Sequence, residues 1–377
     1  MKVTQLYTYP IKSLRAVPIT STHVSPNGFP YDRRFMIFKV LPDGQEERLR
    51  RMTITSFHQM ALFLQKIEPS EDNAEMGKTL TVMYRPPEKH KGKDISMPLV
   101  PSIVGLEQLE VELHQSPTKA YNMGEPYNSW FSSCFGWEVI LVYLGPHLRP
   151  VLGNLSPNAV GDRALSTKSW FSSVTQGLPN LLALKAKGEE GLTFADCAPY
   201  LIVTEESLKN VSERLPDGME MDMTKFRPNI VLSGASSAYE EDFWAGLKIT
   251  SKKHEGEQQP LDMVLTQNCA RCVSINVDYT TGKSGTREDG SMLKKMSKDR
   301  RVDAGAKYSP IFGRYAFLKP DTHTEQNISV GDEAYVTETN RERTRFGQFP
   351  RGFARSHRNQ LTMLQNGRVL VVDARPR

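Results

Sequence analysis

Several features that identify large protein classes are missing from this sequence. No apolar run approaches the roughly 18–20 residues that a membrane-spanning helix needs, and residues 1–15 contain no hydrophobic segment typical of a secretory signal. Neither a βαβ alternation nor a glycine-rich phosphate loop is visible, which argues against a Rossmann or P-loop nucleotide enzyme. We therefore expect a cytoplasmic protein without a signal peptide or transmembrane segment, long enough at 377 residues for two domains.

Cysteine is also scarce. The four cysteines, at positions 134, 197, 269 and 272, are too few and too unevenly spread for a disulfide framework. This scarcity favours a reducing compartment, in which the function of a cysteine lies in its thiolate. Cys134 falls in the segment 125–136, which is typical of a short helix, and we interpret it as a core residue.

The body of the chain has no excess of charge of either sign. The net charge is +5, but residues 341–377 hold nine arginines against Glu342 and Asp373, so that residues 1–340 carry 39 basic and 41 acidic side chains. A near-neutral body is not typical of a duplex-binding surface, and we expect no specific nucleic acid partner. The tail could contact an anionic membrane surface, RNA or an acidic partner, or be a solvated extension. Alternatively, its VLVVDA run at 369–374 adds a strand to the body.

The pattern of β-prone runs predicts an α+β, β-dominant fold. Such runs occur at 3–9, 35–40, 79–85, 107–113, 230–234, 247–250, 273–277 and 334–336. Thr204, followed by two glutamates, predicts the N-cap of a helix. Glycines and prolines between 145 and 161 indicate a domain junction. We divide the chain into an N-terminal domain, a junction, a second domain and an arginine-rich tail, over residues 1–145, 146–190, 191–340 and 341–377.

Four short stretches carry the candidate chemistry. They are Tyr9-Pro10-Ile11-Lys12-Ser13, Asp32-Arg33-Arg34-Phe35, Phe226-Arg227-Pro228-Asn229-Ile230 and Asn268-Cys269-Ala270-Arg271-Cys272. Each alone can be an ordinary structural element. Together they place lysine, arginine, serine and asparagine at strand edges, the side chains suited to an anionic ligand that carries a phosphate.

The CxxC of the last stretch permits more than one interpretation. It could be half of a zinc site, a redox pair or chance, and zinc would need two further ligands of suitable type. A thioredoxin-type role is disfavoured because that motif opens a helix, whereas this one precedes a predicted strand, VSINV at 273–277. There remains a thiolate beside Arg271, whose charge would favour metal ligation or nucleophilic attack.

The order of these stretches resembles that in a known family. The MOSC-domain proteins with an N-terminal MOSC β-barrel domain, and most closely the mitochondrial amidoxime reducing component group, are similar in YPIKS, DRRF, FRPNIVLSG, YEEDFW, CARCVSINVDYTTG, SPIFGRYAFL and ISVGDEAYV. The resemblance covers roughly residues 3–337. It implies two β-barrel domains with flanking helices, which hold the molybdenum cofactor, a pyranopterin dithiolene, between them.

The resemblance also implies a set of site residues. Cys272 corresponds to the thiolate ligand of the metal, and Cys269 is interpreted as packing. The implied cofactor contacts are Lys12 and Ser13 of YPIKS, Arg34 of DRRF, Arg227 and Asn229 of FRPN, and Arg271 before the ligand cysteine, while Asp196 matches an acidic residue near the metal face.

At two positions the chain departs from relatives of the animal type. Those relatives have hydroxyl residues after the aspartate, whereas this chain has Cys197 and Ala198. Hydrogen bonds from these two side chains to the cofactor are therefore not expected, although the backbone amides could still donate.

The reaction implied by the resemblance is the two-electron reduction of an N–O bond. Molybdenum would alternate between Mo(VI) and Mo(IV) and reduce a small N-hydroxylated substrate, such as an amidoxime or hydroxylamine, to an amidine or amine plus water. Electrons would come from a separate haem or flavin protein, of the cytochrome b5 type by resemblance. The protein could lie peripherally at the mitochondrial outer membrane.

Two other functional classes stay open. A MOSC domain also occurs in molybdenum cofactor sulfurases, whose pyridoxal-phosphate desulfurase domain does not fit in this length, so that pyridoxal phosphate binding rests on that analogy alone. The chain could be a stand-alone cofactor carrier or a sulfur relay that uses Cys272 as a persulfide. It could also be a non-enzymatic protein that binds RNA or membrane through its tail.

Overall fold

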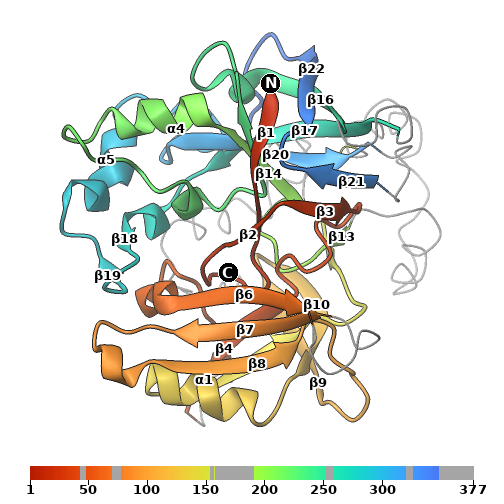
Figure 1. Cartoon of the computed structure of the whole chain (residues 1–377), viewed down its shortest axis with the longest axis vertical. Coiled ribbons are helices and arrows are strands. Elements are labelled where there is room, and N and C mark those ends of the chain that lie inside the picture. The colour runs from red at the N-terminus through yellow and green to blue at the C-terminus, as the bar shows by residue number, and fades with distance from the viewer. Residues whose placement is uncertain are drawn as a thin grey trace, which may run out of the picture.

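The computed structural model describes residues 1–42, 48–69, 78–152, 157, 191–251, 259–319 and 326–347. Most of the predicted junction and tail therefore lies outside the described residues, including the VLVVDA run. The described residues form two β-rich halves, which lie one above the other in Figure 1. Within these residues, no helix is long and apolar enough to cross a bilayer.

The upper half in Figure 1 is a closed barrel of seven strands, in the order β15-β14-β20-β17-β16-β22-β1, because β1 pairs again with β15. The strands are β1 (Lys2–Thr8), β14 (Tyr200–Thr204), β15 (Ile230–Ser233), β16 (Trp244–Thr250), β17 (Leu261–Ala270), β20 (Ile311–Leu318) and β22 (Glu333–Thr339). Alternating apolar residues of these strands, among them Leu6, Tyr200 and Trp244, fill one core. Closure leaves none of these seven strands with a free edge.

Helices and short strands surround this barrel. The helical elements are α4 (Glu205–Ser212), η5 (Met223–Phe226), η6 (Glu240–Phe243), η7 (Val273–Asn276), η8 (Glu288–Ser291) and α5 (Met292–Met296), and the short strands are β18 (Val277–Asp278) and β19 (Lys283–Ser284). α4 starts as predicted, since the Thr204 side chain accepts a hydrogen bond from the Ser207 amide at 3.2 Å.

The first strands of the chain belong to this upper barrel. β1 pairs with β15, with Lys2 opposite Ser233, and β2 (Val17–Ile19) pairs with β1. β3 (Ser21–Val24) pairs with β21 (Gln326–Ser329). The chain then crosses to the lower half. The domain boundaries expected from the sequence stay a prediction.

The lower half consists of two sheets and one helix around a second core. The larger sheet has the order β5-β4-β11-β10-β9, and the smaller one the order β6-β7-β8. The elements are β4 (Phe35–Val40), β5 (Leu49–Arg51), η1 (His58–Leu62), β6 (Phe63–Pro69), β7 (Lys78–Tyr84), η2 (Lys89–Lys91), β8 (Lys93–Pro98), β9 (Gln108–Leu113), β10 (Ser116–Asn122), α1 (Tyr127–Phe135) and β11 (Val139–Tyr143). A further strand pair, β12 (Arg149–Pro150) with β13 (Gly191–Leu192), leads back toward the barrel.

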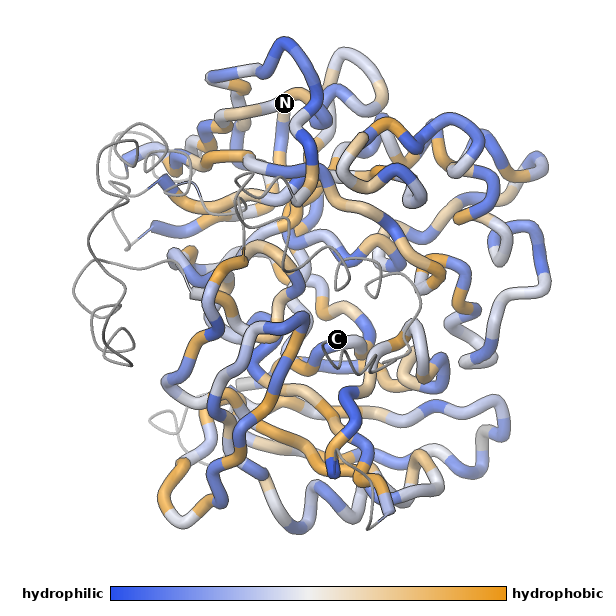
Figure 2. Tube along the Cα trace, turned by 180° about the vertical axis from the view of Figure 1, so that it is seen from behind, coloured by the Kyte–Doolittle hydropathy of each residue, from blue (hydrophilic) through white to orange (hydrophobic). Residues whose placement is uncertain are grey.

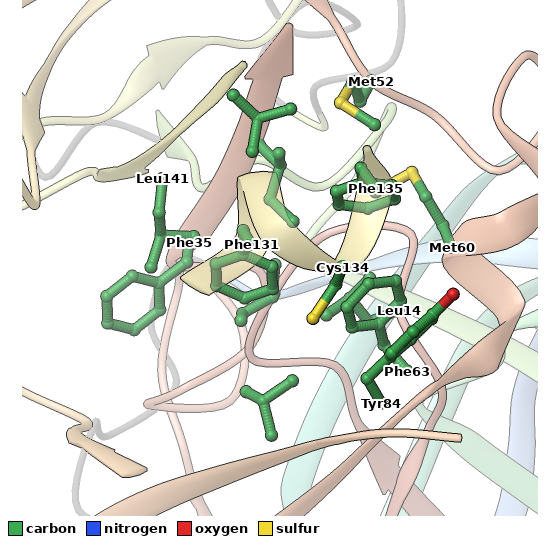
Figure 3. Close-up of a cluster of buried hydrophobic side chains, with 14 of the residues drawn as sticks. Leu14, Phe35, Met52, Met60, Phe63, Tyr84, Phe131, Cys134, Phe135 and Leu141 are labelled. Carbon is green, nitrogen blue, oxygen red and sulfur yellow. The ribbon is translucent and has the colours of Figure 1, made fainter. Parts of the chain in front are cut away.

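This second core is rich in aromatic rings. Phe63 of β6 packs against Phe131 and Phe135 of α1, with ring centroids 5.8 and 4.8 Å apart (Figure 3). Cys134 is buried among them, so its interpretation as a core residue is confirmed.

The predicted β-dominant α+β class is confirmed, with one local correction. Residues 273–277 were expected to form a strand, but η7 is a 3-10 helix and only β18 follows it as a short strand. The reason is tertiary: the Asn276 side chain accepts the Leu293 amide of α5 at 2.9 Å, and its carbonyl accepts the Gly285 amide. These contacts outweigh the β propensity of the two valines and the isoleucine.

Candidate functional site

Lys12 and Ser13 lie on the loop that leaves the barrel after β1. Two hydrogen bonds tie this loop to the lower half, from the Lys12 amide to the Phe35 carbonyl at 2.8 Å and from the Ile11 amide to Gln65 Oε1 at 2.9 Å. Ser13 adopts a left-handed conformation with φ of 69°, and both side chains are buried. The strand end thus carries an ammonium and a hydroxyl to the boundary between the two halves.

Lys12 forms an ion pair with Asp196. Its Nζ lies 2.5 Å from Asp196 Oδ1 and 2.8 Å from the Phe194 carbonyl. Asp196 keeps 57% of its side chain exposed and also contacts His114 Nε2 at 3.1 Å. Partial loss of water acts to raise the pKa of Asp196, but the ammonium of Lys12 and the His114 contact outweigh it and hold that pKa well below its ordinary value. Burial lowers the pKa of Lys12.

His114 was not predicted as a site residue. It occupies a two-residue turn with Gln115 between β9 and β10, and both residues have positive φ, 54° and 63°. The sequence shows only two alternating runs separated by this pair, without the glycine or asparagine that such a turn normally carries. The turn places the His114 imidazole of the lower half against the Asp196 carboxylate, which lies between β13 and the barrel strand β14.

Arg149 holds this arrangement together. Its buried guanidinium donates to three carbonyls, those of Leu113 and Thr193 at 3.0 and 2.9 Å and that of Ala195. Burial lowers the pKa of Arg149 to about 10, so the group stays charged at neutral pH. The hairpin that carries His114 is thereby fixed to the segment that carries Asp196. This arginine stands in no motif, so no sequence pattern marks it as a site residue.

Two arginines flank the ring of Tyr9. The guanidinium carbons of Arg33 and Arg227 lie 4.4 and 4.3 Å from the ring centroid. Arg33 is buried and bonds Asp32 at 2.5 Å and Asn229 Oδ1 at 3.2 Å. Asn229 also accepts the Leu201 amide and donates to the Tyr7 carbonyl, so its amide is engaged within the protein.

Arg227 has an unused donor. Its Nη1 donates to the Leu14 carbonyl at 2.8 Å, whereas its Nη2 is buried without a hydrogen-bond partner among the described residues. Burial and the nearby charge of Arg33 lower the pKa of Arg227. A buried, unpartnered guanidinium nitrogen is costly unless a ligand accepts from it.

Arg34 points elsewhere. Its Nη2 donates to the Gly145 carbonyl, and its guanidinium lies 5.9 Å from the Tyr143 ring at the end of β11. Of the two adjacent arginines, Arg33 is therefore the one that lies beside Arg227. The role expected for Arg34 from the DRRF motif stays a prediction.

Cys272 lies where the two halves meet. It is the exposed one of the four cysteines, and it is the N-cap residue of η7. Its Sγ lies 3.1 Å from the Ser274 hydroxyl and 3.5 Å from the Thr55 hydroxyl, which belongs to the lower half. Neither hydroxyl was identified from the sequence. Within the described residues no three His, Cys, Asp or Glu side chains gather as a metal site, so Cys272 would be a single protein ligand.

The neighbours of Cys272 are structural in this arrangement. The Arg271 guanidinium donates to the carbonyls of Phe226 and Phe312 at 2.6–2.9 Å and is buried. Cys269 is buried and contacts the Tyr315 hydroxyl at 3.0 Å. Burial raises the pKa of Cys269, and the nearby Asp196 adds to this effect.

Comparisons with known proteins agree with this two-part architecture. The MOSC N-terminal beta barrel domain model matches residues 1–138, and the MOSC domain model matches residues 189–335. Mitochondrial amidoxime-reducing component 1 of Mus musculus is 26% identical over 345 residues, 89% of this chain and 82% of that protein, and the Homo sapiens protein matches equally. A molybdenum cofactor sulfurase of Oryza sativa subsp. japonica is 24% identical over 282 residues, 73% of this chain and 28% of the sulfurase.

Proposed function

The chain belongs to the MOSC-domain family, with the MOSC N-terminal β-barrel domain in front, and on that premise we propose that it is a molybdenum-cofactor-dependent oxidoreductase. Its substrates would be small N-hydroxylated compounds of the amidoxime or hydroxylamine type, and its electrons would come from a separate haem or flavin protein. The observation that carries the proposal is the exposed thiol of Cys272 at the meeting point of the two halves.

Cys272 suits the role of metal ligand. A thiolate is a soft ligand, and this one is accessible, whereas the other three cysteines are buried or half-buried. The hydroxyls of Ser274 and Thr55 lie within reach of its sulfur, and each could donate to a thiolate. Such donors would stabilise the negative charge of the ligand and tune the metal.

Lys12, Ser13 and Arg227 would hold the phosphate end of the cofactor. Among the described residues the buried Nη2 of Arg227 is a donor without an acceptor, and Ser13 is buried next to Lys12 in the chain. Lys12 adds an ammonium with a second positive group, Arg33, nearby. This donor set fits a dianionic phosphate, which accepts charge-assisted hydrogen bonds from several donors at once.

Asp196 and His114 would serve proton transfer. The bound cofactor would supply the electron pair that cleaves the N–O bond, and that reduction consumes two electrons and two protons to give the amine or amidine and water. Asp196 stays ionised at neutral pH and is half exposed, so it can accept a hydrogen bond from a substrate N–H or hydroxyl. His114, in contact with the carboxylate, can pass a proton from solvent to that position.

The experiment is a cofactor analysis followed by an assay. Protein purified from a cofactor-competent host is analysed for molybdenum and pterin, and benzamidoxime reduction is then measured with dithionite-reduced viologen as donor. The unmodified chain should carry both and turn over, whereas Cys272→Ala should lose molybdenum and turnover. Absence of molybdenum from the unmodified chain, or full turnover of Cys272→Ala, would refute the proposal.

The similarity to a sulfurase favours one alternative, a cofactor carrier or sulfur relay. In that role the chain would bind the pterin, but it would not reduce benzamidoxime, and Cys272 would accept a persulfide sulfur. Mass spectrometry of the chain after incubation with a cysteine desulfurase and cysteine distinguishes the two, since a relay gains one sulfur at Cys272.

For location, we propose a peripheral position at the mitochondrial surface. The proposal is supported by the names of the relatives, which are called mitochondrial amidoxime-reducing components. The membrane contact expected for 341–377 stays a prediction, because residues 348–377 lie outside the described part.

A further inference from the structure

One edge of the barrel half carries exposed positive charge next to Cys272. Residues 283–307 contain η8 and α5, and α5 packs on η7, the short helix that begins after Cys272. Six basic side chains on this stretch are exposed and form no ion pair with a described residue. They are Lys283, Arg287, Lys294, Lys298, Arg301 and Lys307, and we call them the basic edge.

The acidic residues of the same stretch do not neutralise this edge, because each is already engaged. Asp289 pairs with the buried Lys225 at 3.0 Å, and Asp299 pairs with Arg214 at 2.5 Å. Glu288 pairs with Lys295 at 2.7 Å, and the buried Asp303 accepts two backbone amides, those of Gly305 and Phe346. Three of the four acids are therefore in ion pairs and the fourth accepts backbone hydrogen bonds, which leaves the six cations facing solvent.

The basic edge extends toward the boundary between the two halves, where Cys272 lies. In Figure 1, α5 lies below α4, and β18 and β19 lie below α5 at the boundary with the lower half. From behind, in Figure 2, this part of the molecule lies on the right, and its outer turns are mostly hydrophilic. At the boundary, Ser284 of β19 contacts His58 of the lower half at 3.4 Å.

From these observations we infer that the basic edge is the docking surface for an acidic protein, the electron donor of the reaction. The inference rests on the proposed function for the role of that partner, and on the charges for its chemistry. A cationic surface steers and orients an anionic partner. Tyr308, 58% exposed beside Lys307, supplies the kind of aromatic anchor that is enriched in interfaces.

The test uses two double variants of the full chain that change the net charge equally. Lys294→Glu with Lys298→Glu alters the basic edge, and Lys119→Glu with Lys319→Glu alters exposed lysines elsewhere. The probe is a soluble, negatively charged cytochrome b5 haem domain, titrated at about 0.01 M and about 1 M ionic strength, where the Debye lengths are about 30 and 3 Å. Dissociation constants are measured without substrate.

We expect the edge variant to bind the haem domain on the order of tenfold more weakly than the unmodified chain at low salt, and the three chains to become alike at high salt. The control variant should stay near the unmodified chain. Equal affinities of the two variants at low salt would overturn the inference. It would also be overturned if the edge variant lost retention on phosphatidylserine vesicles but bound the haem domain normally, because the edge would then be a lipid surface.

Benzamidoxime reduction with reduced viologen separates this outcome from failure of the proposed function. That small donor does not need the docking surface, so both variants should keep the turnover of the unmodified chain. Absent turnover in every chain refutes the reductase assignment, whereas normal turnover with equal affinities for the haem domain refutes only the docking surface.

Discussion

Replacement of Arg227 by methionine separates the structural role of this residue from its proposed contact with cofactor phosphate. The substitution removes the Nη1 bond to the Leu14 carbonyl and the contact with the Tyr9 ring. The bond from the charged guanidinium is worth about 1.5–3 kcal/mol of folding stability, and the ring contact about 0.5–1 kcal/mol. Removal of the unpartnered Nη2 offsets part of the loss. We therefore expect the free energy of unfolding to fall by about 1–3 kcal/mol.

The substitution should also weaken cofactor binding. A hydrogen bond from a guanidinium to an ionised phosphate contributes about 1.5–3 kcal/mol, so that loss of the Arg227 donor should weaken pterin affinity about 10- to 150-fold. Pterin content per protein, measured by fluorescence after oxidation, and the urea midpoint of the same samples are the two readouts. Arg34→Met is the comparison variant, because its guanidinium is bonded to the Gly145 carbonyl in the structure, and its pterin content tests the contact expected from the DRRF motif.

Two results would contradict this reasoning. Unchanged pterin in Arg227→Met would show that its free donor does not face the phosphate. A loss of pterin in Arg34→Met with unchanged pterin in Arg227→Met would assign the phosphate contact to Arg34, as the DRRF motif predicts, and not to Arg227.

Further predictions concern the thiols, a buried carboxyl and the C-terminal segment. Two alanine variants should differ in urea unfolding and in metal content. Cys269→Ala should lose about 1–2 kcal/mol of stability, because its sulfur is buried, and should keep molybdenum. Cys272→Ala should keep its stability, because the side chain is exposed, and should lose molybdenum. Burial raises the pKa of Glu241 from 4.5 to about 7. This carboxyl therefore does not lower the free energy of unfolding below pH 4.5, lowers it progressively as pH rises from 4.5 to about 7, and has its full destabilising effect above pH 7. The free energy of unfolding of Glu241→Gln, relative to the unmodified chain, should therefore increase from pH 4.5 to pH 7 and reach an advantage of at most about 3 kcal/mol at pH 8. Equal advantages at pH 5 and pH 8 would contradict this prediction. Calorimetry of truncated chains should show a lower Tm after truncation at Asn340 than after truncation at Gly347, since Arg343 and Phe346 are hydrogen-bonded to the barrel half.

Much of the secondary structure could be predicted from local patterns. The β-prone run at 35–40 and the alternating run at 79–85 predict strands, and the structure has strands at Phe35–Val40 and Lys78–Tyr84. Residues 273–277 alternate equally well, but the contacts of Asn276 with α5 and Gly285 make most of them a 3-10 helix. Local propensity does not contain that information, because the partner lies 17 residues further along the chain.

The candidate site was only partly predictable, for a related reason. Motifs single out Lys12, Arg227 and Cys272 because proline, arginine and cysteine form recognisable patterns. His114, Thr55 and Arg149 stand in no motif, and their place in the site depends on contacts across the two halves. Arg343 is a further example: it donates to the buried Asp242 at 2.8 Å, a contact that the arginine-rich composition around it does not predict.

Because β1 pairs with β15, the upper barrel cannot close until a strand far along the chain has been synthesised. Lys2 lies opposite Ser233, so a ribosome that adds about 5–20 residues per second delivers the partner strand on the order of ten seconds or more after the first. During that interval the lower half can already acquire its core, whereas the Lys12 loop is anchored on one side only. Closure of the barrel requires a contact of long sequence separation, which is a slow step in folding. Closure of the barrel therefore comes late, and it anchors the second side of the Lys12 loop, which would hold the cofactor. The protein can bind the cofactor only after most of the chain has left the ribosome.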